Sequence, residues 1–119
     1  MILIVGGACQ GKTEYAKVHF PKLPVWDEYH LEVKRQLQEQ GDPVKEAVDA
    51  AEKYRNGIII SNELGYGLVP MDPFERQYRE VNGRVNCYLA AQADTVIRMI
   101  CGVGTVIKGR ETVMKSAGE

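Results

Sequence analysis

Short apolar runs alternate along the chain with amphipathic stretches, and this pattern predicts strands that alternate with helices. The apolar residues 1–5 indicate a buried strand, and residues 23–26 form a shorter apolar run that Pro24 interrupts. Residues 58–60 are consecutive isoleucines, a pattern typical of a strand covered on both faces in a parallel sheet. Two further strands are predicted at residues 95–100 and 105–108.

The stretches between these strands carry apolar residues three to four positions apart, which is the spacing of one helix face. A short first helix is predicted over residues 13–20, because Pro21 stops it. Tyr29, Val33 and Leu37 predict the second helix. The last helix begins at Pro73 and is expected to place these apolar residues on one face: Phe74, Tyr78, Val81, Val85 and Leu89.

Another helix is predicted directly before the isoleucine run. Asp42 is expected as its N-cap and Pro43 as its first residue, while Asn56 and Gly57 close it. Its predicted apolar face consists of Val44, Ala47, Val48, Ala51 and Tyr54.

Strands and helices in this order predict an α/β fold, in which helices flank a parallel sheet. A C-terminal β-hairpin is expected to turn through Gly102, Val103 and Gly104. With 119 residues, the chain has room for one domain, residues 1–119, and we expect the polar residues 109–119 to form a flexible tail.

Composition and charge narrow the classes of function. The net charge of −1 removes the usual electrostatic argument for binding nucleic acid or an anionic membrane, so a small-molecule or protein partner is expected. No apolar run reaches the ~18 residues that cross a bilayer, and no basic region precedes residues 1–5, so a cytoplasmic protein is expected.

The cysteines and histidines lack the spacing of a disulfide framework or a zinc site. Cys9, Cys87 and Cys101 are odd in number and far apart, so reduced thiols are expected. His19 and His30 share no ligand spacing with each other or with a cysteine. A metal held mainly by protein side chains is therefore not expected, and His30 is interpreted as a helix residue without a functional role.

The segment Gly6-Gly7-Ala8-Cys9-Gln10-Gly11-Lys12-Thr13 fits the P-loop pattern G-x-x-x-x-G-K-[ST] between a strand and a helix. Its glycines allow close approach of backbone N–H groups to phosphate oxygens at the positive end of the helix. Lys12 is expected to contact the β- and γ-phosphates of ATP or GTP, and Thr13 to place its hydroxyl on Mg²⁺. The pattern predicts a P-loop NTPase-like nucleotide-binding domain.

Asp27 and Glu63 are the acids that follow apolar runs. Either can hold the water shell of Mg²⁺ or act as a general base toward an acceptor hydroxyl. The alternatives are a helix N-cap for Asp27 and a solvated loop acid for Glu63. Since the loops after residues 1–5 and 58–60 leave the carboxyl ends of parallel strands, we expect them to face a common site.

Arginines on the last predicted helix are candidates for phosphate contacts. Arg76, Arg79 and Arg84 are spaced by three and five positions, so they cannot all share one helix face. The hypothesis that one or two of them reach a phosphate stands beside the alternative of a solvated, ion-paired surface.

Two blocks of this sequence resemble the bifunctional adenosylcobinamide kinase/adenosylcobinamide-phosphate guanylyltransferase family of cobalamin biosynthesis. The first is ILIVGGACQGKTEYA at residues 2–16, with Gln10 and Thr13 at positions where the family has serine. The second runs over residues 61–108, from SNELGYGLVP through RQYREVNGRVNCYLAAQAD to GVGTVIK. The resemblance covers roughly half of the chain.

This resemblance implies phosphate transfer from a nucleotide to the hydroxyl of adenosylcobinamide, a corrinoid, followed by guanylylation of that phosphate. Lys12, Glu63 and Asp27 are the catalytic candidates, and Thr13 and Asp27 the candidates for Mg²⁺. By matching position, residues 6–13 would bind the nucleotide, and the site would also be lined by Asn62, Glu63, Gly65, Gly67, Arg79, Arg84 and Asn86.

The sequence departs from the family between the first helix and Asp27, where the family has a further strand and helix with the histidine that becomes guanylylated. His30 lacks the flanking arginines of that histidine, so we expect no stable protein–GMP adduct. Two classes of function follow: an enzyme of the cobinamide kinase type, or a nucleotide-binding module without transfer activity. A homo-oligomer is also expected, because a chain of this length leaves much of its surface uncovered.

Overall fold

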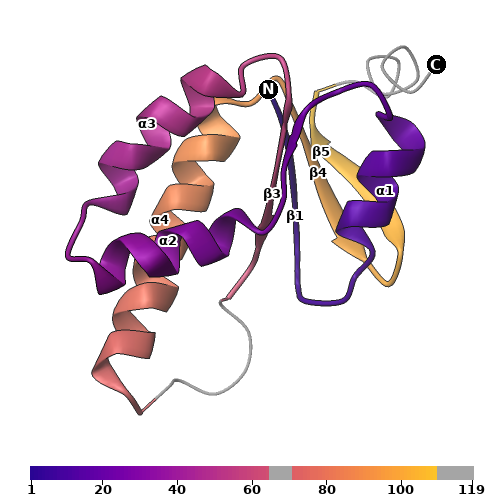
Figure 1. The fold of residues 1–119 in the computed structure, drawn as a ribbon. Helices are drawn as coiled ribbons and strands as arrows, with labels where there is room; N and C mark the ends of the chain where they lie inside the picture. The colour runs from indigo at the N-terminus through magenta and orange to yellow at the C-terminus, as the bar shows by residue number, and fades with distance from the viewer. Residues whose placement is uncertain (65–70, 110–119) are drawn as a thin grey trace.

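A computed structural model describes residues 1–64 and 71–109. A five-stranded sheet in the order β2-β3-β1-β4-β5 runs through the centre of the molecule (Figure 1). The strand β1 (Ile2–Gly6) lies between β3 (Ile58–Asn62) and β4 (Thr95–Ile100) and is parallel to both. At one edge, the short β2 (Val25–Trp26) is parallel to β3. At the other, β5 (Val103–Lys108) returns antiparallel to β4.

Helices cover both faces of this sheet (Figure 1). One face carries α2 (Tyr29–Gln38), α3 (Pro43–Lys53) and α4 (Pro73–Gln92), while α1 (Lys12–His19) lies on the other. Because successive side chains of a strand point to opposite faces, β1 contributes to two separate cores. Leu3 and Val5 pack with the three helices, and Ile2 and Ile4 pack with α1. The predicted α/β fold with a parallel sheet and a C-terminal hairpin is confirmed.

The apolar face predicted for α3 is wrong on one flank. The prediction included Val44 and Val48, but these side chains are 37% and 49% exposed. The buried residues are Pro43, Ala47 and Ala50, so the buried stripe is centred one position earlier than the valines. Small alanines at this stripe let the helix pack closely against its neighbours, which a stripe containing valines would not allow.

Aspartate side chains cap the N-termini of α3 and α4. Asp42 is the N-cap of α3, as predicted, and its Oδ1 accepts a hydrogen bond from the backbone N–H of Lys45 at 3.3 Å. Asp72 caps α4 in the same way through the N–H of Phe74, at 2.8 Å. Each cap satisfies an N–H group that the helix itself leaves unpaired.

The turn of the hairpin begins one residue earlier than predicted. Its turn consists of Cys101 and Gly102, which have left-handed φ angles of 50° and 79°. A turn of two left-handed residues matches the twist of the strands that it joins, so Val103 and Gly104 already belong to β5. Except for Gly109, the predicted tail lies outside the described residues. Within residues 1–64 and 71–109, no helix is long and apolar enough to span a membrane.

Candidate functional site

The loop between β1 and α1 is shaped by close contacts that require glycine. A Cβ atom at Gly6 would lie 2.6 Å from the carbonyl oxygen of Met99, because β4 passes directly beside it. Gly11 has a left-handed φ of 86° at the start of α1, a backbone conformation that residues with a side chain rarely adopt. These glycines therefore let the loop turn sharply from the central strand into the helix.

Gln10 ties this loop to the β4–β5 hairpin. Its side-chain oxygen accepts a hydrogen bond from the N–H of Cys101, and its backbone carbonyl accepts one from the N–H of Gly102 at 3.1 Å. The loop thus rests on the turn of the hairpin. Cys9 at the tip of the loop is exposed and has a left-handed φ of 58°.

The side chain of Lys12 is buried against the loop. Its side chain is 8% exposed, and its Nζ donates a hydrogen bond to the carbonyl oxygen of Gly7. Burial lowers the pKa of this ammonium group, against the opposing effect of the nearby carboxylate of Asp27. The loop therefore holds a cation beside the N-terminus of α1, where backbone N–H groups also favour an anion.

Thr13 and Asp27 meet although they lie on separate elements. The Thr13 hydroxyl donates a hydrogen bond to Oδ2 of Asp27 at 2.8 Å. The other carboxylate oxygen of Asp27 accepts the N–H of Glu28, also at 2.8 Å. The N-cap position of α2 is occupied by Glu28, so the interpretation of Asp27 as a helix N-cap is wrong.

This pair offers hard oxygen donors, which are the ligands that Mg²⁺ prefers. In the part of the chain that the structure describes, no group of three or more His, Cys, Asp or Glu residues could hold a metal ion. A magnesium ion at Thr13 and Asp27 would therefore take its other ligands from phosphate oxygens and water, as is usual for this ion.

Glu63 forms an ion pair with Arg98 across the end of the sheet. The guanidinium donates Nε–H to one carboxylate oxygen at 3.0 Å and an Nη2–H to the other at 3.1 Å. The backbone N–H of Glu63 also donates to the carbonyl of Gly6 at 2.8 Å. Since its side chain is only 22% exposed, the interpretation of Glu63 as a solvated loop acid is wrong.

The sequence analysis missed Arg98. Its signal is a single charged residue inside the otherwise apolar strand β4. A strand residue of this kind needs a partner where the sheet ends, because burying an unpaired charge is costly.

Polar side chains of α4 hold the end of β3. Asn82 and Asn86 both donate to the backbone carbonyl of Asn62, at 2.9 and 3.1 Å. The hydroxyl of the fully buried Ser61 donates to Oδ1 of Asn86 at 2.8 Å. The amides of Asn82, which the sequence analysis missed, and Asn86 thus position the backbone that leads into Glu63.

The arginines of α4 are placed elsewhere. Arg84 forms an ion pair with Glu80 at 2.6 Å, and both side chains are about two-thirds exposed. Arg79 is partly buried on the same helix, and Arg76 is exposed. None of these arginines lines the pocket at the loop. Gly65 and Gly67, which the family resemblance includes in the site, lie outside the described residues.

Two neighbouring pockets open at the carboxyl end of the sheet. The first, of about 270 Å³, is called the loop pocket here: residues 8–13 line it together with Asp27, His30 and Asn62. The second, of about 330 Å³, is the ion-pair pocket, lined by Glu63, Arg98 and the first residues of the loop. Gln10 lines both. Lys12, Thr13, Asp27 and Asn62 thus converge on one pocket, and Glu63 lies in the adjacent one.

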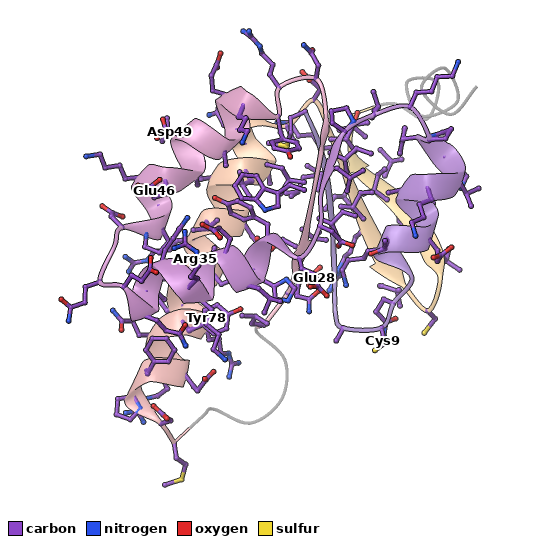
Figure 2. All side chains as sticks on the ribbon, in the orientation of Figure 1. Cys9, Glu28, Arg35, Glu46, Asp49 and Tyr78 are labelled. Atoms are coloured by element: carbon purple, nitrogen blue, oxygen red, sulfur yellow. The ribbon has the colours of Figure 1, made fainter. Side chains whose placement is uncertain are left out.

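His30 is a residue of the loop pocket that sequence reasoning did not assign to the site. It lies in the first turn of α2, three positions after Asp27, and is 9% exposed. Burial lowers the pKa of its imidazole, against the opposing effect of the nearby Glu28 carboxylate. Figure 2 shows the neighbouring Glu28 and the loop residue Cys9 at the same lower end of the sheet. No local pattern in the sequence marks it, because Asp27 lies before the helix and shares no helix face with His30.

Comparison with known proteins gives a family and two relatives. A family model described as cobinamide kinase / cobinamide phosphate guanyltransferase matches residues 20–107. The bifunctional adenosylcobalamin biosynthesis protein CobU of Salmonella typhimurium is 43% identical over 51 residues, and that of Escherichia coli K12 is 41% identical over 51 residues. Each of these matches covers 43% of this chain and 28% of the relative. Residues 6–13 lie before the stretch that the family model matches, so their interpretation rests on their pattern and geometry.

Proposed function

The chain belongs to the cobinamide kinase / cobinamide phosphate guanyltransferase family, and on this premise we propose that it uses ATP or GTP to phosphorylate the hydroxyl of a cobinamide. The observation that carries the proposal is the convergence of Lys12, Thr13 and Asp27 on the loop pocket. These residues come from the start of α1 and the end of β2, and the 2.8 Å hydrogen bond between Thr13 and Asp27 joins the two elements.

Binding of the triphosphate would use the loop and the N-terminus of α1. The backbone N–H groups of residues 6–13 would surround phosphate oxygens, which the positive end of the helix dipole also attracts. Lys12 would exchange the Gly7 carbonyl for a phosphate oxygen, replacing a neutral acceptor by a charged one. Lys12 would therefore contribute to nucleotide affinity as well as to catalysis.

Thr13 and Asp27 would hold Mg²⁺ between them and the phosphates. When bound, the ion supplies positive charge that neutralises the oxygens of the transferred group. The protein's part is to keep both oxygens in place: the N–H of Glu28 fixes the Asp27 carboxylate, and α1 fixes the Thr13 hydroxyl.

In the transfer step, the cobinamide hydroxyl oxygen would form a bond to the γ-phosphorus while the bond from this phosphorus to the β–γ bridging oxygen breaks. The nucleoside diphosphate leaves, and the hydroxyl proton passes to a base. Glu63 is proposed as that base, since it lies beside the loop and Arg98 fixes the orientation of its carboxylate. The guanylyl-transfer step is not part of this proposal.

One observation favours a second candidate, a nucleotide-binding module without transfer activity. Both carboxylate oxygens of Glu63 already accept hydrogen bonds from Arg98, so this pairing must open or share an oxygen before Glu63 can contact an acceptor hydroxyl. The two candidates share the loop pocket and differ in whether phosphate reaches a corrinoid.

Titration calorimetry with ATP and GTP, in the presence of Mg²⁺, tests the shared step. Lys12→Ala is expected to weaken triphosphate binding by about tenfold or more, because a hydrogen bond to a charged group contributes roughly 1.5–3 kcal/mol. Lys17→Ala is the matched control: this lysine lies on the same helix, and its side chain is 69% exposed. Equal affinities of the parent and Lys12→Ala for both nucleotides would refute nucleotide binding at this loop.

A second experiment concerns the acceptor. The parent protein is incubated with labelled nucleotide and a series of cobinamides, and the corrinoid product is analysed for phosphate. Transfer to a cobinamide supports the kinase, whereas tight nucleotide binding without any transfer supports the binding module.

A further inference from the structure

The imidazole of His30 is a polar group of the loop pocket to which the proposed function assigns no role. Its position is well defined, because the hydroxyl of Tyr78 donates a hydrogen bond to the backbone carbonyl of His30 at 2.7 Å. Tyr78 is itself buried and belongs to α4, the helix that holds the end of β3 (Figure 2). The first turn of α2 is thus anchored to the same helix as the rest of the site.

One nitrogen of the ring, Nδ1, is buried and has no hydrogen-bond partner within residues 1–64 and 71–109. A buried polar atom without a partner is costly, so such atoms in a pocket point to a ligand or to a function.

The burial of Nδ1 indicates which nitrogen carries the proton. A buried N–H without an acceptor is rarer in proteins than a buried acceptor without a donor. The neutral tautomer with its proton on Nε2 is therefore favoured. Burial lowers the pKa of the imidazole, against the opposing effect of the Glu28 carboxylate, and this favours the neutral ring, whose only donor in this tautomer is Nε2–H.

The surroundings of the ring suit an anion. Lys12 and the N-terminus of α1 line the same pocket, and both favour negative charge. Three acids, Glu14, Asp27 and Glu28, line it as well, and an anion would enter together with the Mg²⁺ proposed at Asp27, which offsets part of their charge. His30 lines the same pocket as Thr13 and as Asp27, which directly follows β2. A terminal phosphate bound to an ion at Thr13 and Asp27 would therefore lie in the pocket that the ring also lines.

We propose that His30 is a phosphate-binding residue of the loop pocket, whose Nε2–H donates a hydrogen bond to an oxygen of the terminal phosphate of the bound nucleotide. The inference rests on the proposed triphosphate binding at residues 6–13 and adds a specificity-determining contact to it. A contact to this phosphate distinguishes a nucleoside triphosphate from the diphosphate that remains after transfer.

Calorimetric titration of four variants with ATP and ADP tests the contact. His30→Ala is expected to lose about tenfold or more in affinity for ATP and to bind ADP within twofold of the parent. His30→Gln places an amide N–H near the position of Nε2 and is expected to restore most of the ATP affinity. His30→Asn, whose amide reaches only the position of Nδ1, is expected to resemble His30→Ala. His19→Ala is the matched control, because His19 is exposed at the far end of α1.

A spectroscopic measurement on the parent protein makes the test independent of folding of the variants. Imidazole ¹H–¹⁵N correlation spectra are expected to show the Nε2–H tautomer of His30 in the free protein. Adding a non-hydrolysable triphosphate should shift the Nε2 resonance, whereas the diphosphate should not.

The outcomes distinguish a failure of the proposed nucleotide site from a failure of the proposed His30 contact. If the parent and the Lys12→Ala variant bind ATP equally, the proposed nucleotide site fails. If Lys12→Ala weakens ATP binding but His30→Ala changes ATP and ADP affinity by the same factor, or by none, the contact of His30 with the terminal phosphate is refuted while the nucleotide site stands. An Nδ1–H tautomer, or an unchanged Nε2 resonance with bound triphosphate, also overturns it.

Discussion

The pairing of Arg98 with Glu63 determines, at the scale of single residues, how the Glu63 carboxylate is presented. Two hydrogen bonds from one planar guanidinium fix the plane of the carboxylate, which a lysine at the same position would not do. The third contact, from the backbone N–H of Glu63 to Gly6, ties the residue to the first glycine of the loop. A carboxylate held in this way costs little reorganisation when a substrate approaches.

Replacing Glu63 by Gln is expected to lower phosphate transfer to cobinamide by roughly 10²–10⁴-fold, with a much smaller effect on nucleotide affinity. The reason is that a general base acts mainly in the transition state. Glu52→Gln is a suitable control, because Glu52 is an exposed acid of α3 that pairs with Arg55 just beyond the helix. The readouts are the rate of transfer and the dissociation constant of ATP from calorimetry. Unchanged turnover in Glu63→Gln would remove this residue from the mechanism.

At the scale of elements, α4 acts as the support of the site. It donates two amide groups to the carbonyl of Asn62, pairs with the buried hydroxyl of Ser61 and anchors the start of α2 through Tyr78. The same helix buries Val85 and Leu89 in the core on its face of the sheet. Its polar and apolar contacts therefore alternate along one buried face, which explains why asparagines interrupt the apolar pattern.

Asn86→Ala is expected to lower the free energy of unfolding by about 1–3 kcal/mol, because it leaves the Ser61 hydroxyl buried without an acceptor. Urea unfolding measures this change as a lower midpoint at an unchanged slope. Gln77→Ala controls for the loss of an amide on the same helix, since Gln77 is exposed. A midpoint equal to that of the parent would show that Asn86 does not stabilise the end of β3.

At the scale of the whole molecule, the two faces of the sheet are covered unequally. Three helices pack on one face and α1 on the other (Figure 1). Exposed apolar side chains occur on α1, at Val18, and on the edge strand β5, at Val103 and Ile107, which are 69%, 64% and 59% exposed. An edge strand with exposed apolar residues is a common site of contact between chains.

We therefore expect a homo-oligomer in solution, with β5 in the contact. Light scattering at high micromolar concentration should give a mass above the 13.3 kDa of one chain. Ile107→Lys, which places a charge on the edge strand, should shift the mass toward the monomer, whereas Val44→Lys on α3 should not. A parent protein that is monomeric at this concentration would contradict the expected homo-oligomer, whereas the proposed nucleotide binding would be unaffected.

Features that depend on neighbours within a few residues were predictable from the amino-acid sequence. The loop pattern of residues 6–13, the cap at Asp42 and the isoleucine strand each arise from local periodicity, backbone conformation or short-range hydrogen bonds. Because parallel strands carry their following loops to one edge of the sheet, the nearness of the loop and Glu63 could also be inferred. The turn of the hairpin and the buried flank of α3 were wrong by about one position, since boundaries depend on packing.

The pairing of distant side chains was decided by the packing of the elements. Thr13 meets Asp27, Glu63 meets Arg98, and His30 enters the loop pocket, because the register of the strands and the rotation of α2 bring them there. No local pattern encodes these contacts: a single arginine in an apolar strand or a histidine at a helix start is compatible with many partners. The energy that selects one partner comes from burying a charge or a polar atom, and that burial exists only once the sheet and its helices have packed together.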